Sequence, residues 1–243
     1  MLKFELVIPA YNEEKNIELL LETVNAALLE SQLQQTSFRL KLVNNGSSDG
    51  TSSILSSLLE KKVYPWLDVV HVEKNQGYGF GIWSGLQKTS APYVGWTHAD
   101  LQCDPRNAFK ALKQILAHPN PEKVLVKGVR SGRDWKDRMV SRAFEVFAYV
   151  LLGCPVYEIN AQPKVFHRSL LSQMTHPPKT FALDLYAIYH AKKYGMSIQT
   201  IPVQFPPRIH GTSKWASHFL SRYKTILGMI QYMWSLRQKE GSL

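Results

Sequence analysis

A short polar segment near the middle of the chain, HADLQ at 98–102, carries the residue types of a metal site. It ends an apolar run typical of a strand, where residues two apart point the same way. His98 and Asp100 could therefore reach one divalent ion, and Gln102 could add an oxygen ligand. Such an ion would neutralise concentrated negative charge, such as that of a leaving diphosphate. The alternative is that His98 is a strand-end residue without a ligand, because short patterns often arise by chance.

The segments that would position these residues alternate between strand and helix patterns. We expect strands at 3–9, 38–45, 66–73, 93–100 and 123–130, with helices at 13–31, 51–61, 79–89 and 105–118 between them. This alternation predicts an α/β fold with a mostly parallel sheet and helices on both faces. Ligands of such sheets bind beyond the carboxyl ends of the strands. Five polar or glycine-rich loops fall there: PAYNE, NNGSSDGT, KNQGYG, HADLQCD and VRSGRDW.

The second half of the chain is less regular. Apolar helices are expected at 138–152 and 181–195, and a strand at 197–205 is followed by the basic loop PPRIHGTSKW. The last segment places its apolar residues on one helical stripe. We therefore predict one main domain, residues 1–214, and a C-terminal amphipathic helical extension, residues 215–243. Its Tyr, Trp and basic residues suit a membrane interface, and the alternative is packing against the domain or in a homodimer.

Composition bears on the compartment and on the partner. The two cysteines have neither disulfide nor metal spacing, so a reducing, cytoplasmic compartment is expected. We expect no signal peptide, and no apolar run reaches the roughly 20 residues that span a bilayer. The formal charge of +10 indicates an anionic partner, such as a phosphorylated ligand or an anionic membrane surface, or simply a basic soluble protein. A nucleic acid is not expected, because no DNA- or RNA-binding signature is present.

Six motifs, in this order, resemble those of family 2 glycosyltransferases: IPAYNEEKNI, NNGSSDGT, NQGYGFGIWSG, HADLQCDP, VRSGRDWKDRMVS and GTSKW. HADLQ is similar to the Asp-x-Asp signature of sugar-nucleotide enzymes. The most similar subgroup is that of dolichyl-phosphate mannose synthases and bacterial polyprenyl-phosphate glycosyltransferases. The resemblance implies the GT-A fold, a Rossmann-like nucleotide-diphospho-sugar transferase architecture. It also implies inverting transfer of a sugar from a nucleotide-diphosphate donor to a polyprenyl phosphate at the inner, cytoplasmic membrane face.

The resemblance further implies roles for single residues. The nucleotide-binding set would be Pro9, Tyr11, Glu13, Asn45, Asp49, Gly77, His98, Arg208, Ser213 and Lys214. The metal ligands would be His98, Asp100 and Gln102, and the catalytic set would be Asp100, Arg130, Arg138 and Asp184. The two arginines would bind the acceptor phosphate, for which the planar guanidinium is well suited. The alternative for Asp184 is a carboxylate on a helix surface, and the alternative for the arginines is a solvated face.

Several positions depart from the family pattern. Asn44, Asn45 and His98 stand where negative charges would be expected. One interpretation is an active enzyme with altered preferences, in which Asn45 hydrogen-bonds the base and His98 favours Mn²⁺ over Mg²⁺. A second is a degenerate nucleotide-sugar-binding scaffold. A third is transfer to a glycan or protein hydroxyl, with Asp184 as the base. The segment AQPKVF also departs from a Gly-Phe-Arg-like sequence, and Lys164 could supply a cation there.

Overall fold

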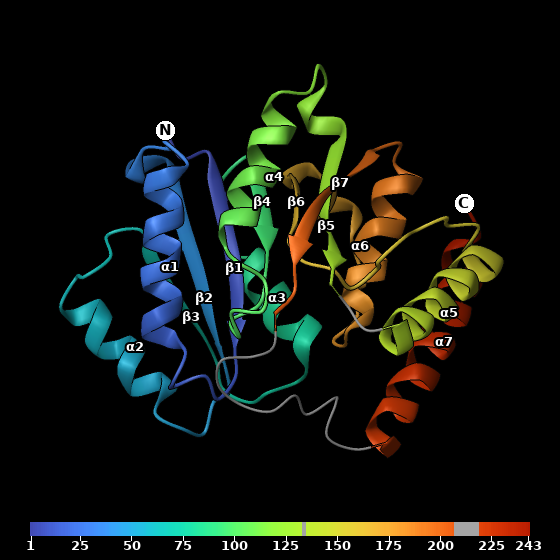
Figure 1. The fold of residues 1–243 in the computed structure, drawn as a ribbon, viewed down its shortest axis with the longest axis horizontal. Coiled ribbons are helices and arrows are strands. Elements are labelled where there is room, and N and C mark those ends of the chain that lie inside the picture. The colour runs from blue at the N-terminus through green and yellow to red at the C-terminus, as the bar shows by residue number, and fades with distance from the viewer. Residues whose placement is uncertain (133–134, 207–218) are drawn as a thin grey trace.

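The computed structural model describes residues 1–132, 135–206 and 219–243, and at 135–138, 140 and 219–224 it describes the backbone alone (Figure 1). In chain order the strands are β1 Phe4–Ala10, β2 Phe38–Asn45, β3 Leu67–Val72, β4 Tyr93–Trp96, β5 Val124–Ser131, β6 Lys164–His167 and β7 Ser197–Gln204. The helices are α1 Ile17–Glu30, α2 Thr51–Glu60, α3 Tyr78–Leu86, α4 Arg106–Leu116, α5 Trp135–Leu152, α6 Ala182–Lys193 and α7 Phe219–Glu240. Short 3₁₀ turns cover Gln35–Ser37, Pro121–Lys123 and Arg168–Gln173.

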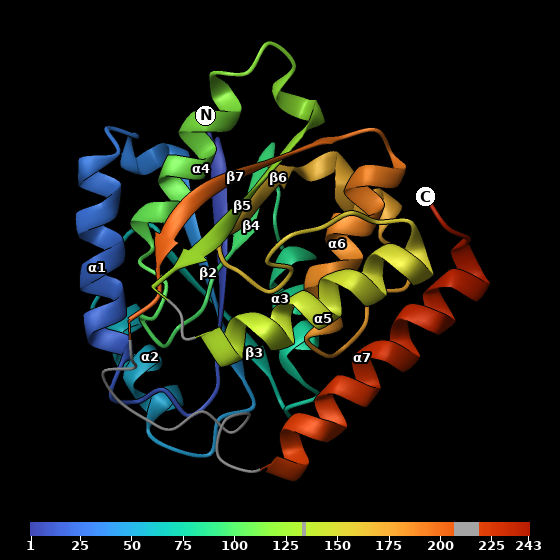
Figure 2. The same cartoon turned by 45° about the vertical axis from the view of Figure 1, so that its right-hand side comes forward.

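The strands of the described chain form one sheet in the order β3-β2-β1-β4-β6-β5-β7. Strand β6 is antiparallel to both of its neighbours, and every other pairing is parallel. Helices cover both faces of the sheet (Figure 2). The predicted α/β fold with a mostly parallel sheet is therefore confirmed.

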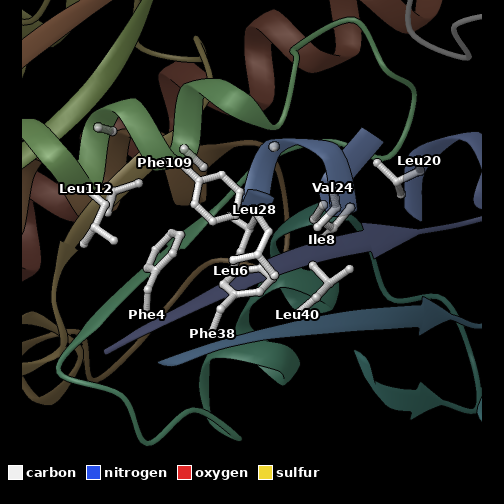
Figure 3. Close-up of a cluster of buried hydrophobic side chains, with 14 of the residues drawn as sticks. Phe4, Leu6, Ile8, Leu20, Val24, Leu28, Phe38, Leu40, Phe109 and Leu112 are labelled. Carbon is white, nitrogen blue, oxygen red and sulfur yellow. The ribbon is translucent and has the colours of Figure 1, made fainter. Parts of the chain in front are cut away.

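Two apolar cores hold the layers together, and β1 contributes to both because its side chains alternate between the faces. Phe4, Leu6 and Ile8 pack against α1 and α4, whereas Val7 faces α3. Figure 3 shows the first core, where the ring of Phe109 lies 5.8 Å from that of Phe4. Burying each such side chain contributes about 1.5–3 kcal/mol, so the first core firmly fixes the strand whose end begins the site.

Strand β6 was not predicted from the sequence. It is four residues long and follows Pro163, so its own sequence has too few positions to show a period of two. Its position depends on pairing with β4 and β5, which are distant in sequence. The pairing places Lys127 of β5 opposite Lys164 of β6, inside the protein.

The C-terminal helix α7 packs beside α5, as both views show (Figures 1 and 2). Met229, Met233 and Leu236 are buried in the second core, and the Leu243 amide donates to the Leu152 carbonyl. Within the described ranges, no helix combines the length and apolar character that a bilayer crossing requires.

Candidate active site

The loops that follow β1 and β2 are tied together at the carboxyl edge of the sheet, the lower edge in Figure 1. The amide of Glu13 donates to Thr51 Oγ1 at 3.0 Å, and the amide of Glu14 donates to Asp49 Oδ2 at 3.2 Å. Asp49 Oδ1 accepts from the Thr51 amide, so one oxygen of this carboxylate holds the start of α2 and the other holds the loop after β1. Burial opposes the charge, but these hydrogen bonds bring the pKa of Asp49 below its ordinary value. Two of the predicted nucleotide-binding residues, Glu13 and Asp49, are thus fixed side by side.

The two asparagines that replace expected acids have structural partners. Asn44 Oδ1 accepts from the Ser47 amide at 3.1 Å and shapes the turn after β2. Asn45 is 3% exposed, and its Nδ2 donates to the Gly77 carbonyl at 3.1 Å. An aspartate at position 45 would have no N–H to donate to the Gly77 carbonyl, so two hydrogen-bond acceptors would face each other. The Oδ1 atom of Asn45 is buried and has no hydrogen-bond partner in the described chain.

Gly77 and its neighbours at the start of α3 leave no room for side chains. Gly77 has φ +118°, and a Cβ there would overlap the Lys179 carbonyl oxygen. A Cβ on Gly81 would meet the amide of Asn45 at 2.7 Å. At Gly77 the backbone conformation and the close approach both exclude other residues, and at Gly81 the close approach to Asn45 does so. The predicted nucleotide-binding residues Asn45 and Gly77 therefore form one packed unit, with Pro9 of β1 in register beside β2.

A chain of buried and partly buried polar groups, which we call the Lys164–His98 chain, runs beneath this edge. It consists of Lys164, Asp184, Gln162, Tyr78 and His98. Lys164 Nζ lies 2.6 Å from Asp184 Oδ1, with side chains 0% and 1% exposed. Gln162 Nε2 lies 2.9 Å from Asp184 Oδ1 and 3.0 Å from the Tyr78 hydroxyl. The Tyr78 hydroxyl lies 3.0 Å from His98 Nε2. Through these contacts the Lys164–His98 chain links α6, β6 and α3 to the segment that follows β4.

Burial is the largest cause of the pKa shifts of His98, Tyr78 and Lys164 in the Lys164–His98 chain. It lowers the pKa of His98, although the carboxylates of Asp100 and Asp184 oppose the shift. It raises the pKa of Tyr78 well above the ordinary value, and the negative charge of Asp184 adds to the effect. Burial also lowers the pKa of Lys164, against the attraction of Asp184. Near neutral pH the imidazole and the phenol are thus both uncharged.

Two expectations from the sequence are corrected here. Asp184 is not a carboxylate on a helix surface, because it accepts from Lys164, Gln162 and Trp96 Nε1 inside the protein. Lys164 is not a cation available to an acceptor, because it is fully buried against Asp184. Both residues appeared polar and exposed in the sequence because their burial depends on the unpredicted strand β6.

The three predicted metal ligands have other partners or surroundings that decide whether they could hold a divalent ion. Asp100 is 5% exposed, and its Oδ1 accepts from the Gln102 amide. Gln102 Nε2 donates to the Pro206 carbonyl at 3.0 Å, and His98 Nε2 is engaged by Tyr78. No group of three His, Cys, Asp or Glu side chains suited to a metal occurs in the described part of the chain. The three residues do not fit a closed protein-only site, and Asp100 is their single carboxylate.

A second charged cluster lies at the end of β5. Arg130 Nε donates to Glu158 Oε2 at 2.6 Å, and its guanidinium lies 5.4 Å from the ring centroid of Phe205. Lys127, 1% exposed, donates to the carbonyls of Gly128 and Tyr157 at 2.8 and 2.7 Å. Burial, aided by the charge of Lys164, lowers the pKa of Lys127 to about 7. Lys127 was missed in the sequence, where its only signal is one lysine inside an apolar strand.

Several predicted residues cannot be placed in this geometry. Three of the predicted nucleotide-binding residues, Arg208, Ser213 and Lys214, lie outside the described residues, as does the side chain of Arg138. Tyr11 is described and is partly buried directly after β1. Arg142, in the same run of arginines as Arg130, lies 3.7 Å from Glu145 and over the ring of Tyr157.

Comparison with known proteins identifies related sequences. The model of the family described as "Glycosyl transferase family 2" matches residues 5–194. The undecaprenyl-phosphate 4-deoxy-4-formamido-L-arabinose transferase of Enterobacter sp. (strain 638) is 26% identical over 219 residues, which cover 88% of this chain and 63% of the relative. The corresponding protein of Serratia proteamaculans is 28% identical, with the same coverage. The chain thus spans somewhat less than two thirds of the length of these relatives.

Solved structures show the same fold. Glucosyl-3-phosphoglycerate synthase from Mycobacterium tuberculosis, in complex with Mn²⁺, UDP and glucosyl-3-phosphoglycerate, has a TM-score of 0.68 at 20% identity. That comparison covers 99% of this chain and 81% of the other. A mannosyltransferase from Pyrobaculum calidifontis, in complex with GDP-Man and Mn²⁺, has a TM-score of 0.61 at 17% identity, covering 99% and 76%. At these identities the likeness bears on the fold, and it confirms the predicted GT-A architecture.

The low pKa of Lys127 predicts a pH-dependent stability. The unfolded chain keeps this lysine protonated up to its ordinary pKa, so above pH 7 the unfolded state binds more protons and stability rises with pH. Between about pH 7 and pH 8.5, we expect the free energy of unfolding to rise by about 1.5 kcal/mol more in the unaltered chain than in Lys127→Met. Urea unfolding at each pH measures this difference. The exposed Lys123→Met is the matched control and should follow the unaltered chain, and identical pH profiles for all three proteins would contradict the assignment.

Proposed function

The chain belongs to glycosyl transferase family 2, and on that premise we propose that it transfers a sugar from a nucleoside-diphosphate donor to a polyprenyl phosphate. The acceptor class is supported by the curated relatives, whose name is undecaprenyl-phosphate 4-deoxy-4-formamido-L-arabinose transferase. The observation that carries the proposal is the family match over residues 5–194, which spans the loops at the carboxyl edge from β1 to β5.

At the donor end, the base and ribose would bind among Pro9, Tyr11, Glu13, Asn45, Asp49 and Gly77. The hydrogen bonds that join the loops after β1 and β2 support this, because they hold Glu13 and Asp49 side by side at the carboxyl edge. The diphosphate is still predicted to be bound by Arg208, Ser213 and Lys214. The acceptor phosphate is still predicted to be bound by Arg138.

The environment of Asp184 favours a phosphate acceptor over a hydroxyl acceptor. A hydroxyl needs a general base within hydrogen-bond reach, and Asp184 was the first candidate. Asp184 is 1% exposed, and one of its oxygens already receives three hydrogen bonds. A phosphate oxygen is ionised near neutral pH, so positioning and charge stabilisation suffice. Attack by that oxygen from the face opposite the diphosphate would invert the anomeric centre.

We also propose that a divalent ion binds together with the diphosphate, held on the protein side by Asp100. The Mn²⁺ and Mg²⁺ complexes among the structural neighbours support this class of cofactor. When bound, the ion would stabilise charge on the leaving diphosphate. The predicted preference for Mn²⁺ over Mg²⁺ would require His98 Nδ1 as a ligand, because Tyr78 engages Nε2.

The membrane side of the reaction is assigned to α5 and α7. Large apolar side chains are exposed on them at Met139, Val146, Val150 and Trp234, each more than half exposed. With the net charge of +10, such a face suits the surface of an anionic membrane. We propose peripheral attachment at the cytoplasmic face, with residues 215–243 as the functional extension of the 1–214 domain. A homodimer through α7 stays a prediction.

Transfer itself can be measured with radiolabelled UDP-, GDP- and CDP-sugars and undecaprenyl phosphate in vesicles. We expect one donor class to label the lipid phosphate and none to label undecaprenol. Because Arg130 is proposed to contact the acceptor phosphate, Arg130→Lys should lower the transfer rate by about 10- to 100-fold, the loss of a charged hydrogen bond. The exposed Arg168→Lys is the matched control, because Arg168 directly follows the antiparallel β6 at the opposite edge. Labelling of undecaprenol would favour a hydroxyl acceptor, and no labelling with any donor would favour a degenerate scaffold.

The metal proposal predicts cooperation between the ion and the nucleotide. Mn²⁺ should bind the protein weakly alone and about tenfold or more tightly with the matching nucleoside diphosphate, because one carboxylate cannot complete a divalent site. Electron paramagnetic resonance of protein-bound Mn²⁺ measures this. Asp100→Asn should abolish the cooperation, whereas Asp104→Asn, whose carboxylate pairs with Arg106, should keep it. Equal cooperation in both variants would remove Asp100 from the metal site.

A further inference from the structure

The directions of the hydrogen bonds in the Lys164–His98 chain follow from its buried end. Lys164 has only protons to donate, and the Asp184 carboxylate beside it has only lone pairs to accept them. The Gln162 amide must therefore turn its NH₂ group, and not its oxygen, toward Asp184. The flipped amide would set two acceptors against each other, so the assignment of Gln162 follows from chemistry.

The same reasoning extends to the edge of the sheet. The second N–H of Gln162 donates to the Tyr78 hydroxyl, which therefore accepts on that side. The buried Tyr78 hydroxyl also has a proton to donate, and among its contacts in the described chain only His98 Nε2, 3.0 Å away, can accept it, so we direct the proton there. A neutral imidazole has one accepting and one donating nitrogen. Because Nε2 accepts, Nδ1 of His98 carries the proton.

This tautomer conflicts with a metal at His98. Coordination through Nδ1 would move the ring proton to Nε2, and Nε2 would then donate toward Tyr78. The Tyr78 hydroxyl would receive hydrogen bonds from both His98 and Gln162, and its own proton would lose the acceptor that the described chain provides. The buried Lys164–Asp184 ion pair thus opposes the metal-bound form of His98 from three hydrogen bonds away.

We propose that His98 is a hydrogen-bond donor to the donor diphosphate through its Nδ1–H, held in that tautomer by Tyr78, and is not a metal ligand. The proposal rests on the proposed function, since it names how that site meets its diphosphate. His98 lies two residues after the last residue of β4 and two residues before Asp100. In this arrangement Asp100 binds the cation, and His98 donates a hydrogen bond directly to a phosphate oxygen. A neutral donor at position 98 attracts that oxygen, whereas a carboxylate would repel it without an intervening ion.

The tautomer can be tested without any ligand. Histidine-selective ¹⁵N labelling and long-range ¹H–¹⁵N spectra show which nitrogen of each ring is protonated, and the signal lost in His98→Gln identifies His98. We expect protonated Nδ1 in the unaltered chain and a shift toward protonated Nε2 in Tyr78→Phe. Tyr93→Phe is the matched control, because Tyr93 makes an edge-on ring contact with His167 at 5.4 Å, as Tyr78 does with His98. Protonated Nε2 in the unaltered chain, or no change in Tyr78→Phe, overturns the proposal.

The role toward the diphosphate is tested by calorimetry with the nucleoside diphosphate in EDTA and in Mn²⁺. His98→Asn keeps an N–H donor, so its affinity in EDTA should stay within about threefold, whereas His98→Asp should lose about 10- to 100-fold. A metal ligand at position 98 would give the reverse order in Mn²⁺, with Asp binding more tightly than Asn, and that result overturns the proposal. If the unaltered chain binds no nucleotide, the proposed function fails and the assigned ligand of His98 fails with it. The tautomer measurement would then still report separately on Tyr78 and His98.

Discussion

The ion pair of Lys164 and Asp184 is the constraint on which the geometry of the site depends. Both groups are fully buried and 2.6 Å apart, so neither can lose its partner without leaving a charge in the interior. Three hydrogen-bond donors converge on one oxygen of Asp184, and through Gln162 and Tyr78 they orient His98. A pair that would be a costly way to stabilise a core is here a means of orienting polar groups at the sheet edge.

The ion pair exists because one strand runs against the others. Strand β6 inserts between β4 and β5 in the antiparallel direction and carries Lys164 into the second core, where α6 presents Asp184. The same insertion sets Lys127 opposite Lys164 in the interior, where burial first and the charge of Lys164 second lower the pKa of Lys127. The remaining strands are parallel, so their loops meet at one edge. The loops of the parallel strands and the polar groups oriented by the buried charges therefore meet near the end of β4.

The parts of this arrangement that depend on local pattern were predictable. Strand β2 was expected at 38–45 and found there, because its apolar run is bounded by a polar turn. The loops after β1 and β2 were predicted to share an edge, and the hydrogen bond from the Glu14 amide to Asp49 joins them. The burial of Asp184 and Lys164 was not predictable, because it results from pairing between segments distant in sequence. Asn45 shows the same limit: its replacement of an acid is explained only by the Gly77 carbonyl beside it.

The central claim is that the interior ion pair holds a working nucleotide site at the carboxyl edge. The most direct measurement is a calorimetric titration with UDP, GDP and CDP of the unaltered chain and of the double variant Lys164→Met/Asp184→Asn, which removes both charges and keeps the volume. The account predicts that one nucleotide binds the unaltered chain and that the folded double variant binds it at least about tenfold more weakly, the loss of an oriented hydrogen bond to a charged group. Equal affinity of the two proteins would contradict the account, as would no binding of any nucleotide to the unaltered chain.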